Sequence, residues 1–226
     1  MSLKARVVVQ CALTAVVTGA LLFLPAGTWR FWPGWIFLAL LMIPMVGVSI
    51  YFAEHDPQLV ERRLQRGEKV AEQRVIIRLA GLIFFGAFLL PGFDFRFGWS
   101  QKSFGGVPVW LMILCGAIAL AGYLMTYWVM ATNSYASRTI QVEKEQRVIS
   151  VGPYRIVRHP MYTGGLIATV FLPLALGSYW AVPAFALLIP VIALRILNEE
   201  KILREELAGY PEYCLRTRWR LVPFVW

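Results

Sequence analysis

The sequence of 226 residues has little charge, only two histidines and only three cysteines. Soluble domains carry about 25% charged residues, whereas this chain carries 15% and lacks the polar surface of a water-soluble globule. His55 and His159 are too few for the multi-histidine di-iron sites of membrane desaturases. The odd number of cysteines, without motif spacing, predicts neither a disulfide framework nor a zinc site. The composition therefore excludes intrinsic disorder, collagen, disulfide scaffolds and soluble nucleic-acid binders.

What the chain has instead is long stretches without charge, in a composition that is 58% hydrophobic. A bilayer core of ~30 Å needs about 20 helical residues to cross it, and several stretches are that long. The stretch from 160 to 194 is too long for one helix and is interrupted at Pro173 and Gly177, which predicts a helical hairpin. We expect an all-α, polytopic membrane protein with about six transmembrane helices, over residues 6–24, 31–53, 75–92, 107–131, 160–176 and 179–197.

The basic residues are distributed unevenly between the two ends of these predicted spans. Of the 22 lysines and arginines, all but Arg30, Arg96 and Lys102 fall on one side. This asymmetry predicts an even number of spans with both termini cytoplasmic. The net charge of +9 is therefore explained by topology, with membrane lipids rather than nucleic acid as the partner.

Two of the connecting segments have local signals of their own. Asp56-Pro57 has the residue types of a helix N-cap and first helical position, with Gly67 as a stop, and predicts an interfacial helix. Between Thr139 and Ser150, apolar and polar residues partly alternate, which indicates a short hairpin or an irregular cover.

The polar chemistry concentrates in residues 152–165, in a loop that leads into a predicted membrane helix. Pro160 suits the first helical turn, where its missing N–H costs nothing, and the other N–H groups of that turn form an anion site. Such a loop suits a ligand with a carboxylate or phosphate and an aromatic base. The alternative is that its arginines only mark the cytoplasmic side. The residues that point to a ligand site are Gly152, Tyr154, Arg155, Arg158, His159, Tyr162, Gly164 and Gly165.

Two further clusters follow the last predicted span. Glu199 and Glu200 emerge where the helix leaves the membrane, beside the start of its hairpin partner, and can meet an amine, a ribose diol or a cation. Surface ion pairs at i,i+4 spacing, such as Glu200 with Arg204, are the alternative. The segment 209–221 has the pattern of a helix stop, a new helix and a basic, aromatic surface segment. It is either a membrane anchor or a lid in which Arg216 or Arg218 meets an anionic group.

The order and spacing of these motifs resemble the isoprenylcysteine carboxyl methyltransferase family, and more broadly the membrane phospholipid-methyltransferase-like enzymes. The detailed resemblance covers residues 128–226, and upstream it extends only to hydropathy and to the stretch 56–63. The resemblance implies methyl transfer from S-adenosylmethionine to a lipophilic small-molecule or lipid substrate, with a carboxylate favoured as acceptor. The compact chain is similar to the bacterial branch, which implies a bacterial inner membrane.

The resemblance also implies roles for individual residues. It divides one integrated domain into N-terminal transmembrane helices, residues 1–131, and a catalytic region with a cytoplasmic cofactor pocket, residues 132–226. Arg216, Arg218 and Glu200 would act in catalysis. The expected cofactor-binding residues are Gly152, Tyr154, Arg158, His159, Pro160, Tyr162, Gly164, Glu199, Glu200, Tyr210 and Tyr213.

Two other classes of protein remain open at the level of sequence. Membrane sterol reductases end in a similar loop and use NADPH, although they are usually much longer. A non-catalytic membrane protein is the second alternative. Transporters tend to carry ionisable residues at mid-membrane, whereas the predicted spans here are apolar at their centres. An amine or thiol acceptor is also compatible with the residues, since a glutamate or His159 could accept its proton.

Overall fold

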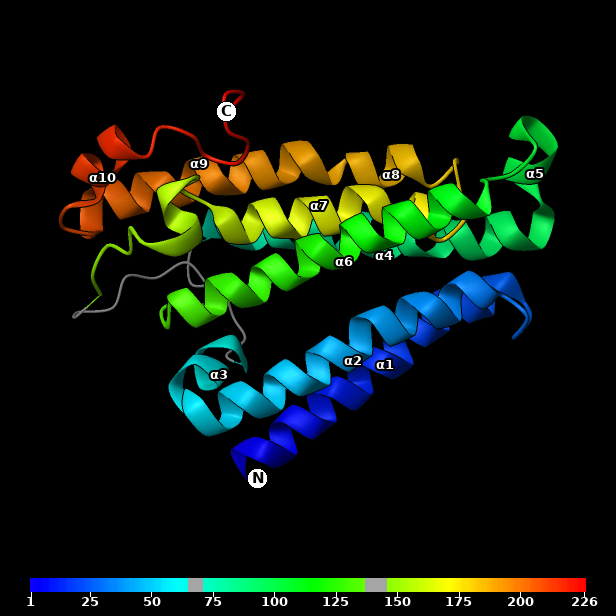
Figure 1. The fold of residues 1–226 in the computed structure, drawn as a ribbon, viewed down its shortest axis with the longest axis horizontal. Helices are drawn as coiled ribbons and strands as arrows, with labels where there is room; N and C mark the ends of the chain where they lie inside the picture. Colours follow the sequence, from blue (N-terminus) through cyan, green and yellow to red (C-terminus); the bar gives the residue numbers. More distant parts are fainter. Residues whose placement is uncertain (65–70, 137–145) are drawn as a thin grey trace.

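The computed structural model describes residues 1–64, 71–136 and 146–226, which are helical with no strand among them (Figure 1). The predicted all-α class is therefore confirmed. The helices are α1 Leu3–Ala26, α2 Trp32–His55, α3 Pro57–Leu64, α4 Ala71–Phe97, α5 Trp99–Phe104, α6 Val109–Thr132, the 3₁₀ turn η1 Gly152–Arg155, α7 Pro160–Ala175, α8 Val182–Ala186, α9 Leu188–Glu206 and α10 Tyr210–Arg216.

Five helical segments are long and apolar enough to cross a membrane, and they coincide with five of the predicted spans. They are Leu3–Ala26, Trp32–His55, Glu72–Phe97, Val109–Thr132 and Val182–Glu206. The sixth predicted span is α7, a shorter apolar helix of 16 residues. At 1.5 Å per residue it is ~24 Å long, less than the hydrocarbon thickness. The chain is an integral membrane protein. The location of both termini on the cytoplasmic side stays a prediction.

Helix ends follow the local sequence signals. The Asp56 carboxylate accepts a hydrogen bond from the backbone N–H of Leu59 at 3.0 Å and so caps α3 as predicted. Leu59 and Val60 are buried against Val7 of α1 and Phe52 of α2, which fixes α3 at the end of this helix pair. The predicted stop at Gly67 and most of the hairpin predicted over 139–150 lie outside the described residues.

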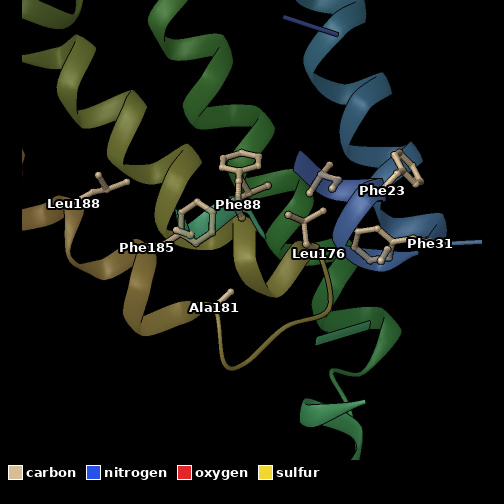
Figure 2. Close-up of a cluster of buried hydrophobic side chains, with 11 residues drawn as sticks. Phe23, Phe31, Phe88, Leu176, Ala181, Phe185 and Leu188 are labelled. Atoms are coloured by element: carbon tan, nitrogen blue, oxygen red, sulfur yellow. The ribbon is translucent and has the colours of Figure 1, made fainter. Parts of the chain in front are cut away.

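The main hydrophobic core lies at the end of the bundle where the α7–α8 turn passes α1 and α4 (Figure 2). Phe88 of α4 contacts Phe185 of α8 edge to face, with ring centroids 5.4 Å apart. Figure 1 shows α5 at this end of the molecule and α3 and α10 at the opposite end, toward which both termini lie. The core therefore anchors one end of the helices and leaves the other end for polar chemistry.

A buried carboxylate connects three segments near this core. Asp94 of α4 accepts hydrogen bonds from the Ser100 N–H at 2.7 Å, and from the Ser100 and Ser178 hydroxyls at 2.5 Å each. The Ser100 hydroxyl oxygen in turn accepts from the backbone N–H of Tyr179. Asp94 thus holds the α4–α5 corner against the α7–α8 turn.

Replacing Asp94 with alanine is expected to lower the free energy of unfolding by about 2 kcal/mol, because hydrogen bonds to charged groups are lost and buried donors are left without acceptors. Ser103→Ala, at an exposed position on α5, the helix that carries Ser100, is the control and should be neutral. Thermal unfolding in detergent measures both variants. Equal stability of the two would show that the Asp94 contacts do not hold the corner.

Candidate active site

The loop that leads into α7 is shaped by one glycine and one proline. Gly152 opens η1 with φ +58°, a conformation that favours glycine, and a Cβ there would lie 3.2 Å from the Thr132 side chain. Pro160 is the first residue of α7, as predicted from its missing N–H. The loop therefore turns tightly against the end of α6 before α7 begins.

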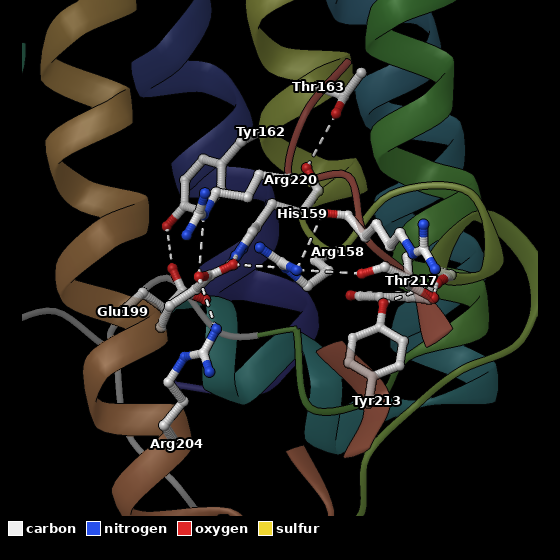
Figure 3. Close-up of polar contacts among 12 residues, drawn as sticks. Arg158, His159, Tyr162, Thr163, Glu199, Arg204, Tyr213, Thr217 and Arg220 are labelled. Carbon is white, nitrogen blue, oxygen red and sulfur yellow. Dashed lines mark hydrogen bonds and ion pairs between the residues drawn. The ribbon is translucent and has the colours of Figure 1, made fainter. Parts of the chain in front are cut away.

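Glu200 of α9 is the centre of a buried ionic cluster at the start of α7. Figure 3 labels its partners, which are Arg158, His159, Arg204 and Arg220. The Glu200 side chain is 4% exposed, and one oxygen accepts from Arg158 Nε at 2.7 Å and lies 3.3 Å from His159 Nε2. The other oxygen accepts from Arg220 Nε at 3.1 Å and lies 3.7 Å from Arg204. The predicted i,i+4 pair of Glu200 and Arg204 is confirmed, although Glu200 belongs to a buried network and not to the surface.

The tail after α10 folds back over the same loop. Trp219 and Arg220 accept hydrogen bonds through their carbonyls from the backbone N–H groups of Arg158 and His159, at 2.8 and 3.0 Å. The Thr163 hydroxyl donates to the carbonyl of Leu221 at 2.8 Å. The N–H groups that precede α7 are therefore satisfied by the tail, so the anion site predicted at this helix start does not include them.

Glu199 points in a different direction from Glu200 and is held by a second set of contacts. The Tyr162 hydroxyl donates to the Glu199 carboxylate at 2.7 Å and accepts from Arg195 Nε at 2.7 Å. The backbone carbonyl of Arg195 accepts from the amide of Gln73, which is fully buried on α4. Contacts from α4, α7 and α9 thus orient the Glu199 carboxylate.

Three tyrosines supply aromatic surface beside Glu199. The Tyr213 hydroxyl donates to the carbonyl of Tyr154 at 2.8 Å, and the Tyr154 hydroxyl accepts from Asn133 at 2.8 Å. Burial raises the pKa of Tyr154 to about 12, with Asn133 opposing the shift and Glu199 adding to it. Burial likewise raises the pKa of Tyr210 and Tyr213. All three therefore remain neutral phenols at physiological pH.

These residues enclose a cavity of about 270 Å³ at the end of the bundle near α3 and α10. The Tyr210 hydroxyl on its wall is buried and has no hydrogen-bond partner among the described residues. A buried polar group without a partner costs free energy, and a ligand with a polar group would satisfy it. The predicted site residues that line the cavity are Tyr154, Arg158, His159, Pro160, Tyr162, Glu199, Tyr210 and Tyr213.

The other predicted site residues lie around the cavity or away from it. Glu200 supports the cavity wall from behind, through Arg158 and His159. Gly164 faces α6, where a Cβ would come within 2.6 Å of the Gly122 carbonyl. Arg216 and Arg218 are exposed, and only the backbone carbonyl of Arg218 contacts the site, through Arg158. The catalytic role of these two arginines stays a prediction.

Several residues of the site were not among the predicted ones. Arg63 of α3 and Met161 of α7 line the cavity, as do Asn133 and Arg195. Arg220 completes the Glu200 cluster, and its guanidinium also lies 5.2 Å from the centre of the Trp226 ring. Arg195 and Glu199 are i,i+4 neighbours on α9, and both contact the Tyr162 hydroxyl.

A second, larger cavity of about 740 Å³ lies between α2 and the pair α6 and α7. Its lining is almost entirely apolar, with residues such as Ile36, Leu40, Leu120 and Leu172. Arg63 and Met161 line both cavities. The polar cavity at the end of the bundle is therefore adjacent to an apolar one among the membrane-spanning helices.

Comparison with known proteins agrees with this arrangement. Residues 110–208, which include all of α6 except its first residue, the loop, α7 and all of α9, match the phospholipid methyltransferase family model. The solved structure of the eukaryotic intramembrane Ras methyltransferase ICMT (isoprenylcysteine carboxyl methyltransferase) is similar, with a TM-score of 0.59 at 16% identity over 95% of this chain and 75% of that one. No curated protein matches the sequence. Residues 110–208 are therefore similar to the phospholipid methyltransferase family, and the chain as a whole has a fold similar to that of the isoprenylcysteine carboxyl methyltransferase structure.

Proposed function

We propose that this protein uses S-adenosylmethionine to methylate a lipophilic acceptor, and that the acceptor group is a carboxylate. The observation that carries the proposal is the pair of adjacent cavities that share Arg63 and Met161. One cavity offers a carboxylate and tyrosines to a polar, positively charged cofactor. The other offers mainly apolar surface among the membrane-spanning helices to a hydrocarbon chain.

The residues around the polar cavity fit the cofactor by their chemistry. The Glu199 carboxylate would bind an ammonium group or a ribose diol. The tyrosine rings offer faces that attract a cation and stack on a base. The Tyr210 hydroxyl, buried without a partner, would gain a hydrogen bond. Behind these groups, the Glu200 cluster and the tail carbonyls fix Arg158 and His159 and exclude water from the start of α7.

S-adenosylmethionine, when bound, supplies an electrophilic methyl group on a sulfonium. Transfer is an in-line displacement, for which positioning of the two reactants provides most of the rate enhancement. A carboxylate acceptor is ionised at pH 7 and requires no general base. The neutral tyrosines are poor bases at this pH, because their pKa values are raised. These tyrosines therefore do not supply the general base that an amine or thiol acceptor would need, which favours a carboxylate as the acceptor.

Calorimetric titration of the detergent-solubilised protein with S-adenosylhomocysteine is expected to show binding, and titration with NADPH is not. Glu199→Gln should weaken S-adenosylhomocysteine binding about tenfold or more, because a charge-assisted contact is lost. Tyr162→Phe should have a smaller effect in the same direction, since Glu199 loses a donor that orients it.

Glu206→Gln, at an exposed position on the same helix, is the matched control and should bind as the wild type does. Thermal unfolding of each variant separates loss of binding from loss of fold. Binding of NADPH without S-adenosylhomocysteine would assign the protein to the reductase class instead. If neither ligand binds, both the methyltransferase and the reductase assignments are contradicted.

A further inference from the structure

Arg63 is a charged residue at the junction of the two cavities. It lies in the last turn of α3, and it is the single charged residue among those that line the apolar cavity in the described part of the chain. Its Nη1 donates to the Ala136 carbonyl at 3.2 Å and lies 3.5 Å from the Met161 sulfur. Its guanidinium therefore lies between α3, the end of α6 and the start of α7.

The short helix that carries Arg63 is fixed in place. Leu59 and Val60 bury its inner face, and the Asp56 carboxylate caps its start. The neighbouring Arg62 donates to the Ser134 carbonyl at 3.0 Å, which is a further connection to the chain after α6. The position of the Arg63 guanidinium is thus set by packing, a property expected of a residue that positions a ligand.

The apolar cavity is elongated along the helices. Along α7 its lining extends from Met161 to Ala175, a distance of ~21 Å at 1.5 Å per residue. Along α6 it extends from Met112 to Thr126, which is the same length. Arg63 and Met161 lie at one end, next to the polar cavity. This shape suits one extended hydrocarbon chain with its head group toward Arg63.

We propose that Arg63 binds the anionic head group of the acceptor, a single-chain lipid carboxylate, and holds it at the junction while the hydrocarbon chain occupies the apolar cavity. Arginine suits this role because its planar guanidinium pairs with a carboxylate through two parallel hydrogen bonds. The inference rests on the proposed function. It makes Arg63 a residue that determines acceptor specificity.

The test uses 16-bromohexadecanoate and its methyl ester, which differ in the charge of the head group and carry the bromine at the end of the chain, toward Trp32 at the start of α2. Bromine quenches tryptophan fluorescence on contact, and Trp32 lies in the lining of the apolar cavity. The difference in quenching between the wild type and Trp32→Phe, in detergent micelles, reports occupancy of that cavity. Arg63→Gln is expected to weaken binding of the acid about tenfold or more, and to leave binding of the ester unchanged. Arg63→Lys should retain part of the affinity.

Two controls separate this proposal from its alternatives. Arg74→Gln removes a positive charge from an exposed position near the start of α4 and should bind the acid as the wild type does. Thermal unfolding of Arg63→Gln at the wild-type temperature, together with its unchanged binding of the ester, shows that the fold and the apolar cavity are intact. Failure of the wild type to bind S-adenosylhomocysteine would overturn the proposed function, whereas the comparison of acid and ester tests Arg63 alone.

Three results would overturn the role of Arg63. The first is unchanged affinity of Arg63→Gln for the acid. The second is equal loss of acid and ester, which would indicate a packing role. The third is a loss of acid binding in Arg216→Ala or Arg218→Ala with none in Arg63→Gln. That result would assign the head group to the arginines of the tail.

Discussion

Replacing Glu200 with glutamine is expected to lower the free energy of unfolding by about 3–5 kcal/mol, the cost of removing one partner from a buried ionic cluster. The amide has the shape of the carboxylate but cannot neutralise Arg158, whose side chain is 6% exposed. Arg220 and His159 would lose the same partner. Because Arg158 and His159 line the polar cavity, binding of S-adenosylhomocysteine should fall together with stability.

Chemical unfolding in detergent measures this effect, and Glu205→Gln is the matched control. Glu205 lies on the same helix but is exposed, so its substitution should be close to neutral. A stable Glu200→Gln variant that has lost only methyl transfer would contradict a structural role. It would favour the direct catalytic role that the sequence motifs predict for this residue.

Replacing Gly164 with alanine is expected to cost about 3 kcal/mol, at the upper end for overpacked sites. Helices α6 and α7 make the most extensive contact between described helices, and their backbones approach closely where Gly122 and Gly164 face each other. A Cβ on Gly164 would lie 2.6 Å from the Gly122 carbonyl oxygen. Both are backbone positions, so no side chain can rotate away and the helices must separate.

The neighbouring Gly165 is the matched control for this experiment. A Cβ on Gly165 has nothing within 4 Å, and alanine has a higher helix propensity than glycine by about 1 kcal/mol. Gly165→Ala should therefore be neutral or slightly stabilising in the same thermal unfolding assay. Equal losses for the two variants would show that the contact with Gly122 does not limit stability.

Most of the fold could be predicted because local runs of apolar and charged residues determine where the membrane-spanning helices begin and end. The uncharged stretches predicted the positions of the long apolar helices, and the break near Gly177 predicted the hairpin. The Asp56 cap also followed from local sequence. What hydropathy cannot show is how closely two helices approach. Gly164 was therefore interpreted as a ligand position, whereas its Cα faces Gly122.

The site could be predicted only in part, because the direction of each side chain depends on helix geometry and on contacts between distant segments. Glu199 and Glu200 are adjacent in sequence, but consecutive residues on a helix are rotated by about 100°. One carboxylate therefore lines the cavity and the other joins the buried arginines. Arg63 was missed as a site residue because its contact with Met161 spans 98 residues. No local motif carries information over that distance.

The contacts of Arg158 also set when the site can form during synthesis. Its carboxylate partner, Glu200, lies 42 residues further along the chain, and the tail carbonyls that bind its guanidinium lie 59 and 60 residues further along. At roughly 5–20 residues per second, a ribosome needs about 2–8 s to reach Glu200. During this interval α7 is made while the Arg158 charge has neither of these partners. The loop must therefore remain hydrated until α9 and the tail emerge, so the polar cavity is completed after the spans that carry it have been made.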